Sequence, residues 1–205
     1  MSDSPIKVLV VEDNSFMQST IERMVIDMEG VEVVGLAADG VAAVKEALAT
    51  KPDVILMDIV LPKMDGIEAS RKIKHELSDV RILMVSGDEG DDSIVAAFAA
   101  GADGFCTKST VLEQLERAIR TVATGQTWLD PVIGEKILSG EGSTSALRAT
   151  VFTKLGLTAL EITVLRLLIK RVAEDQIAGD LAMTLEEVKA HVQTIRGKLM
   201  AKQKT

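Results

Sequence analysis

The segment from residue 6 to residue 13 reads Ile6-Lys7-Val8-Leu9-Val10-Val11-Glu12-Asp13, a short apolar, β-branched run that ends in two acids. Four further runs of this kind cover residues 31–36, 54–57, 82–85 and 104–107. The segments between them carry apolar residues at helical spacing. Strands that are apolar on both faces and separated by helices favour parallel pairing with right-handed crossovers. This part of the chain is therefore predicted to be α/β, a doubly wound five-stranded parallel sheet.

Chemically active side chains follow the strands of this sheet. Glu12 and Asp13 come after the first strand, and Asp58 comes after the third. Ser86 ends the fourth strand and Lys108 follows the fifth. In an open doubly wound sheet the ligand site lies beyond the carboxyl ends of the strands, so these residues are expected to meet at one edge. Any one of the acids alone would be an ordinary solvated turn residue, and only the complementary set points to a site.

Three clustered carboxylates repel one another unless a hard cation neutralises them. Oxygen ligands in a partly open site suit Mg²⁺, which also accepts a phosphate oxygen. Asp58, central among the acids, is placed to attack phosphorus and form an acyl phosphate. Lys108 and the hydroxyl of Ser86 would bind the transferred phosphoryl oxygens, so the reaction would depend on positioning and charge neutralisation.

Residues 5–125 resemble the receiver domain of response regulators, which has a flavodoxin-like fold. The matching motifs are Val10-Val11-Glu12-Asp13, Asp58-Ile59-Val60-Leu61-Pro62-Lys63-Met64-Asp65-Gly66, Val85-Ser86-Gly87 and Gly101-Ala102-Asp103-Gly104-Phe105-Cys106-Thr107-Lys108. The resemblance implies the following roles: phosphoacceptor and catalytic residues Asp58, Lys108 and Ser86; Mg²⁺ ligands Glu12, Asp13, Asp58 and the Val60 carbonyl; switch residues Ser86 and Phe105. Phosphorylation would draw in the Ser86 hydroxyl and let the Phe105 ring turn inward.

Charge and composition divide the chain. The net charge is −8, but residues 1–144 carry 13 basic against 25 acidic residues and residues 145–205 carry 10 against 6. Such asymmetry suggests two domains with different partners. The small residues at 139–145 are typical of a flexible linker. We expect a receiver domain at 5–125, a linker with a short helix at 126–150, and a small all-α domain at 151–205.

The last part of the chain has helical periodicity throughout. Two capping boxes, beginning at Thr158 and Thr184, each open a helix. Val188, Val192, Ile195 and Leu199 form an apolar stripe on the second of these helices. With a short helix at residues 175–181 before it, this pattern fits a helix-turn-helix unit, although generic packed helices would show the same periodicity.

Residues 157–200 are similar to the C-terminal domain of NarL/LuxR-type regulators. The resemblance rests on Leu157-Thr158, Glu161, Val164-Leu165, Leu167-Leu168, Ile177-Ala178, Leu181, Val188-Lys189, His191-Val192, Ile195 and Lys198-Leu199. It implies that the last of these helices enters the major groove of DNA. The DNA contacts expected on it are Lys189, Ala190, Gln193, Arg196 and Lys198.

The sequence departs from that family pattern at several positions. Arg171 replaces the glycine expected after the first helix, and Glu174-Asp175-Gln176 replaces Asn-Lys-Glu. Glu186 and Glu187 stand where Lys and Thr are usual, so two acids would face DNA phosphates. The sequence stops at Thr205, so the family's usual last helix, which serves dimerisation, is expected to be missing, and Lys198, Lys202 and Lys204 form a basic tail.

These observations favour a cytoplasmic, phosphorylation-dependent response regulator that controls transcription through a C-terminal DNA-binding domain. Its expected partners are a sensor histidine kinase, DNA and a second copy of the chain, with no membrane. The alternative is a receiver-controlled protein-interaction regulator whose helix-turn-helix domain no longer binds DNA. We expect no enzymatic turnover of an external substrate. An aspartyl-phosphate phosphatase would need a second acid two residues after Asp58, where the sequence has Val60.

Overall fold

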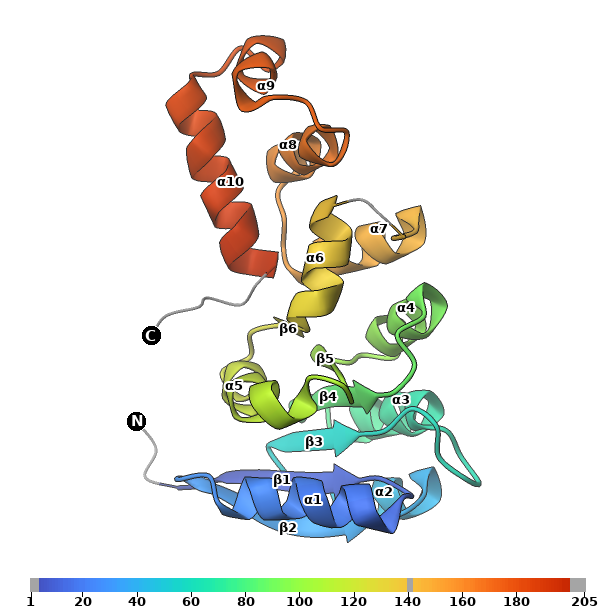
Figure 1. The fold of residues 1–205 in the computed structure, drawn as a ribbon. Helices are drawn as coiled ribbons and strands as arrows, with labels where there is room; N and C mark the ends of the chain where they lie inside the picture. Colours follow the sequence, from blue (N-terminus) through green and yellow to red (C-terminus); the bar gives the residue numbers. More distant parts are fainter. Residues whose placement is uncertain (1–3, 140–141, 200–205) are drawn as a thin grey trace. The chain divides into compact units, whose positions relative to one another are not determined.

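The computed structural model describes residues 4–139 and 142–199, which form two compact units, 1–128 and 129–205 (Figure 1). The first unit alternates strands with helices: β1 Ile6–Val11, α1 Ser15–Ile26, β2 Val31–Ala37, α2 Gly40–Thr50, β3 Val54–Met57, α3 Gly66–Glu76, β4 Arg81–Ser86, α4 Asp91–Ala99, β5 Gly104–Thr107 and α5 Val111–Ala123. A short strand β6, Trp128–Leu129, follows at the boundary of the units. Within the described ranges, no helix is long and apolar enough to cross a membrane.

The strands form one sheet in the order β2-β1-β3-β4-β5-β6, and the pairs from β2 to β5 are parallel. The direction of strand addition reverses after β2, so right-handed crossovers place α1 on one face and α2, α3 and α4 on the other. Figure 1 shows α1 and α5 on the near side of the sheet and α3 behind it. The predicted five-stranded parallel core is confirmed, and β6 is an addition that the sequence reading missed.

The core of this unit is the apolar sheet itself. All residues of β3 and β5 are buried, as are the last four of β1. Cys106 is buried within β5, as expected for a small apolar side chain. Trp128 is also buried, with the guanidinium of Arg117 5.7 Å from its ring centroid. The pairing register places the strand ends side by side, with Val11 opposite Met57 and Ser86 opposite Thr107.

The second unit is helical. Its elements are α6 Pro131–Ser139, α7 Ser145–Lys154, α8 Ala159–Ile169, α9 Glu174–Asp180 and α10 Leu185–Leu199. The range 126–150, expected to hold one short helix, holds α6 and the first part of α7. The predicted linker at 139–145 lies partly outside the described residues. Of the predicted basic tail, Lys202 and Lys204 lie outside them.

Both predicted capping boxes are present. Thr158 and Glu161 exchange backbone-to-side-chain hydrogen bonds at the start of α8. Thr184 and Glu187 do the same at the start of α10. The stripe Val188, Val192 and Ile195 is buried, and α10 packs against α8 and α9. The Leu199 side chain of that stripe lies outside the described part.

Two turns of this unit place non-glycine residues in the left-handed region. Arg171, at the position where the family resemblance led us to expect glycine, has φ 58°, and Ala182, between α9 and α10, has φ 52°. In both turns the backbone adopts a conformation that glycine favours, although neither residue is glycine. Each such residue costs roughly 1–2 kcal/mol relative to an unstrained one.

Ala182→Gly is expected to stabilise the helical unit by about 1 kcal/mol, because glycine adopts this φ without a steric penalty. Hydrogen–deuterium exchange of the α9 and α10 amides would measure the change. The matched control is Ala190→Gly, the same substitution at an exposed site inside α10, which is expected to destabilise the helix by about 1 kcal/mol. Equal effects of the two substitutions would contradict the assignment of strain to Ala182.

Candidate functional site

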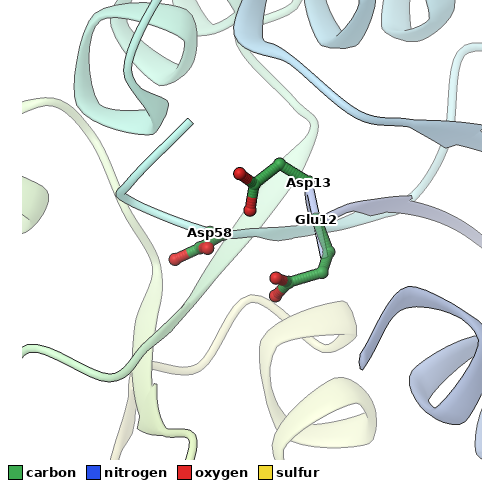
Figure 2. Close-up of side chains that lie close together, drawn as sticks. All are labelled: Glu12, Asp13 and Asp58. Atoms are coloured by element: carbon green, nitrogen blue, oxygen red, sulfur yellow. The ribbon is translucent and has the colours of Figure 1, made fainter. Parts of the chain in front are cut away.

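The carboxyl ends of β1 and β3 bring three acids together. Glu12 and Asp13 directly follow β1, and Asp58 directly follows β3. Their ligand oxygens all lie within 4.8 Å of one another. Figure 2 shows the three carboxylates converging from the two strand ends. Glu12 and Asp58 are buried, at 2% and 4% exposure, while Asp13 is exposed and leaves the cluster open to solvent.

Lys108, the first residue after β5, reaches across the sheet edge to this cluster. Its ammonium lies 2.8 Å from Asp58 Oδ2 and 2.7 Å from Glu12 Oε2. Burial alone would lower the pKa of Lys108, but the hydrogen bonds to the two carboxylates outweigh it and raise the pKa. The side chain therefore stays cationic where positive charge is needed.

Glu12 has a pKa above its ordinary value, chiefly because burial penalises its charged form and also because Asp58 repels it. Lys108 and the Asn14 amide offset part of this effect. The cluster thus contains three carboxyl groups, and the single ammonium of Lys108 does not neutralise their combined charge. Such a site gains from a second cation.

The donor chemistry fits Mg²⁺. The three clustered ligands are all carboxylate oxygens, and the exposed Asp13 leaves room for water or a phosphate oxygen. Val60, the fourth predicted ligand, lies in the same loop as Asp58, and its amide donates to Asp58 Oδ1 at 3.3 Å. Ligation by the Val60 carbonyl stays a prediction.

The two predicted switch residues lie on the neighbouring strands. Ser86, at the end of β4, is fully buried, and its Oγ accepts a hydrogen bond of 3.0 Å from the Asp88 amide. That contact uses the oxygen as acceptor and leaves the hydroxyl proton available for a phosphoryl oxygen. Phe105, in β5, is also fully buried. Its ring therefore lies inward in this structure, and the predicted rotation stays a prediction.

Sequence reasoning missed two residues that shape the loop after Asp58. Asp39, the N-cap of α2, accepts a hydrogen bond of 2.6 Å from Lys63 in that loop. Gly40 follows it, and a Cβ there would lie 2.2 Å from the Met64 carbonyl oxygen. Both belong to the segment after β2, a strand end that carried no recognised chemistry. An Asp-Gly pair in such a place is an ordinary helix-start signal, so only the structure reveals the contact.

The predicted DNA-contacting residues lie on α10. Lys189, Ala190, Gln193 and Arg196 are all exposed, on the side of the helix away from the buried stripe. Glu186 and Glu187 are exposed in the first turn of the same helix. The hydrogen bonds from Thr184 lower the pKa of Glu187, so this acid has a structural role in the capping box. Within the described residues, no contact of the Glu186 side chain explains why an acid stands at this position.

The two acids that stand in place of Asn and Lys before Ile177 also have a structural role. Glu174 and Asp175 occupy the first turn of α9, whose N-cap Ala173 makes no side-chain hydrogen bond. Negative side chains stabilise a helix N-terminus through the helix dipole. This departure from the family pattern therefore serves the helix start.

Lys198 has an internal partner that the sequence reading did not anticipate. Its ammonium lies 2.7 Å from Glu161 Oε2 and 3.1 Å from the Gly156 carbonyl oxygen. Glu161 is buried, with 4% of its surface exposed, so the α8 capping box is joined to α10 by an ion pair. A DNA phosphate would have to compete with Glu161 for this lysine, and its predicted DNA contact stays untested.

Glu161→Gln is expected to destabilise the helical unit by about 2 kcal/mol at pH 7, because it leaves Lys198 without its counter-charge. Burial raises the pKa of Glu161, but the hydrogen bonds from Lys198 and Thr158 outweigh it and hold the pKa below 4.5. The stabilisation is therefore complete above pH 4.5 and is lost as the pH falls through the lower folded-state value. Hydrogen exchange of the α8 and α10 amides, measured as a function of pH, should show the stability difference between the wild type and Glu161→Gln disappearing in acid.

Glu187→Gln is the matched control, because Glu187 forms the equivalent capping box of α10 and, within the described residues, its carboxylate accepts hydrogen bonds from Thr184 and not from a lysine. This substitution is expected to leave the stability close to that of the wild type, because Glu187 is exposed to solvent. A Glu161→Gln variant as stable as this control at pH 7 would mean that the ion pair contributes nothing measurable.

Comparison with known proteins gives a consistent result. A family model described as "Response regulator receiver domain" matches residues 8–120. The chain is 32% identical to response regulator protein VraR of Staphylococcus aureus over 98% of this chain and 93% of that protein. It is 40% identical to response regulator GacA of Pseudomonas aeruginosa over 132 residues, which are 64% of this chain and 62%, under two thirds, of GacA.

Solved structures give the same picture. A LuxR-family two-component response regulator from Aurantimonas sp. SI85-9A1 is 33% identical, with a TM-score of 0.63 over 65% of this chain and 96% of that one. A structure of RcsB dimers bound to DNA matches 96% of this chain and 92% of that one with a TM-score of 0.58. At 18% identity, the second likeness concerns the fold alone.

Proposed function

The chain belongs to the response regulators of the NarL/LuxR type, and from this premise we propose that it is a phosphorylation-dependent regulator of transcription. In the proposed reaction, a carboxylate oxygen of Asp58 attacks the phosphorus of a phosphohistidine on a sensor histidine kinase. The bond from phosphorus to the histidine nitrogen breaks, and an acyl phosphate forms on Asp58. The chain turns over no external substrate.

The observation that carries this proposal is the contact of the buried Asp58 carboxylate with Lys108. A lysine at 2.8 Å can follow the negative charge as it moves onto the phosphoryl oxygens. The Ser86 hydroxyl proton is available to another of these oxygens. Mg²⁺ held by Glu12, Asp13, Asp58 and the Val60 carbonyl would supply charge neutralisation at the phosphoryl group.

The signal would reach the C-terminal unit as a change in charge and hydrogen bonding. Phosphorylation adds about −1.5 to −2 charges at Asp58. A shift from mostly inactive to mostly active needs about 5.5 kcal/mol of differential stabilisation, which several desolvated charge-assisted hydrogen bonds can supply. Ser86 and Lys108 are the groups proposed to provide them.

For DNA contact we propose the exposed row of α10, with Lys189 and Arg196 as the cationic members and Gln193 as a base-reading side chain. The support is the exposure of this row opposite the buried stripe and the fold shared with the DNA-bound RcsB. Since that structure contains RcsB dimers on DNA, we propose that this chain also binds DNA as a homodimer.

A titration by fluorescence anisotropy with labelled duplex DNA tests this step. The full chain would be compared with and without beryllofluoride at two salt concentrations, beside a Lys189→Ala variant. Affinity should rise on activation, fall with salt at a slope of about −0.9 per phosphate contact, and be weaker in the variant. Equal affinity of wild type and variant would remove Lys189 from the interface.

The second candidate is a regulator whose C-terminal unit binds a protein and not DNA. The observation that favours it is the exposed Glu186, which would face a phosphate with the wrong sign. An absence of binding at low salt, both with and without beryllofluoride, would decide for this candidate.

A further inference from the structure

The loop of residues 59–65, here called the acceptor loop, connects Asp58 to α3 and contains a strained turn. The Met64 amide donates to the Pro62 carbonyl oxygen at 2.7 Å, closing a three-residue turn around Lys63. Lys63 has φ 64°, in the left-handed region. A γ-turn with positive φ at its centre is rare and strained, and lysine gains none of the tolerance of glycine there. A contact outside the turn must therefore stabilise this conformation of Lys63.

The Lys63 side chain supplies one such contact. Its ammonium lies 2.6 Å from Oδ2 of Asp39, in the segment that connects β2 to α2. The Asp39 side chain is only 12% exposed, while that of Lys63 is 68% exposed. The hydrogen bond from Lys63, together with that from the Ala42 amide, lowers the pKa of Asp39 and keeps it charged. The ion pair thus joins a fixed helix cap to the strained residue of the acceptor loop.

A second contact fixes the same two segments at close range. Gly40 lies against Met64, and a Cβ on Gly40 would meet the Met64 carbonyl oxygen at 2.2 Å. The backbones of the two loops therefore touch at the residues adjacent to the ion pair. At its other end, the acceptor loop contacts the phosphoacceptor, because the Val60 amide donates to Asp58 Oδ1. The loop is held at one end by α2 and at the other holds the phosphoacceptor.

We propose that Lys63 is a positioning residue, whose ion pair with Asp39 anchors the strained acceptor loop on α2 and so sets the rate at which Asp58 accepts a phosphoryl group. This inference rests on the proposed function of Asp58. Lys63 itself touches no reacting atom, and it acts through the loop backbone. Because small misplacements of a reacting group slow a reaction steeply, loss of the ion pair has a kinetic effect larger than its effect on folding.

The test is the initial rate of phosphorylation of the full chain by acetyl phosphate with Mg²⁺, followed by intact-protein mass spectrometry. Lys63→Met, which keeps an unbranched side chain but removes the charge, is expected to slow labelling by about three- to tenfold. Asp39→Asn keeps the cap acceptor for Ala42 and is expected to slow it similarly. The double variant should be no slower than either single variant, because the same ion pair is lost. Lys63→Arg should restore most of the rate.

Two controls separate positioning from folding and from general electrostatics. Lys72→Met removes an exposed ion pair of 2.8 Å with Glu68 on α3, outside the acceptor loop, and should leave the rate unchanged. The thermal unfolding midpoints of all variants should lie close to that of the wild type, because the side chains of Lys63 and Lys72 are largely exposed and such ion pairs contribute little to stability.

Labelling of Lys63→Met at the wild-type rate, or equal slowing by Lys72→Met, would overturn the proposal. A rate that falls only in step with the unfolding midpoint, or additive effects of the two substitutions, would also overturn it. A failure of the proposed function is distinct, because the wild-type chain itself would then not be labelled at Asp58.

Discussion

Asp58→Asn is expected to abolish phosphoryl transfer from acetyl phosphate to this protein. The amide of asparagine is not a nucleophile toward phosphorus, so no acyl phosphate forms at this position. The other acids of the cluster do not substitute, since Glu12 is paired with Lys108 and has a raised pKa because of burial, and Asp13 stands at the exposed rim. Mass spectrometry of the intact protein would show no added phosphoryl group.

The matched control is Asp53→Asn, the same substitution at the opposite end of the same strand. Asp53 precedes β3 and accepts a hydrogen bond from the Lys7 amide at 2.8 Å, which an asparagine can also accept. This variant should be labelled like the wild type. Unchanged labelling of Asp58→Asn would show that the acceptor has been misassigned.

Gly66→Ala is expected to have the second largest effect. A Cβ at Gly66 would lie 1.9 Å from the Asp58 carbonyl oxygen and 3.0 Å from Met57 Cγ. Neither neighbour can move freely, because β3 is buried on both faces and the Gly66 amide donates to the Ile59 carbonyl oxygen. We expect a loss of about 3 kcal/mol in the free energy of unfolding. Phosphorylation should fall at least about tenfold, since the backbone of Asp58 must shift.

Gly87→Ala is the matched control in the same domain. Its added Cβ would meet nothing nearer than Lys108 Cδ at 3.9 Å, an ordinary contact distance. Urea unfolding should place this variant within about 0.5 kcal/mol of the wild type. A Gly66→Ala protein with the stability and labelling rate of this control would mean that the close approach of α3 to Asp58 is not needed.

The strand ends were predictable because a parallel sheet obeys a simple geometry. Apolar runs identify the strands, and the carboxyl ends of all parallel strands meet at one edge. That reasoning brought Glu12, Asp58 and Lys108 together, and the structure places them within ion-pair distance. The capping boxes at Thr158 and Thr184 were equally predictable, because both partners lie within three residues of each other in the chain.

Other contacts could not be read from the chain because their partners are far apart in sequence and ordinary in type. In the sequence, Lys198 is one of several basic residues near a helix end. Only the packing of α10 on α8 brings it to Glu161. Lys63 and Asp39 are likewise 24 residues apart. The strand β6 was missed because two residues carry no detectable period.

Local sequence is enough to predict three features: the order of strands and helices along the chain, the sheet edge that carries the acids, and the helix that exposes Lys189 and Gln193. These follow from local periodicity, which burial of apolar side chains enforces residue by residue. The contacts that hold the acceptor loop, and the lysine of α10 that pairs with a buried acid, become visible only in the folded chain. Those outcomes depend on distances of a few ångströms between separate segments, and such distances are fixed by packing and by the pairing of buried charge.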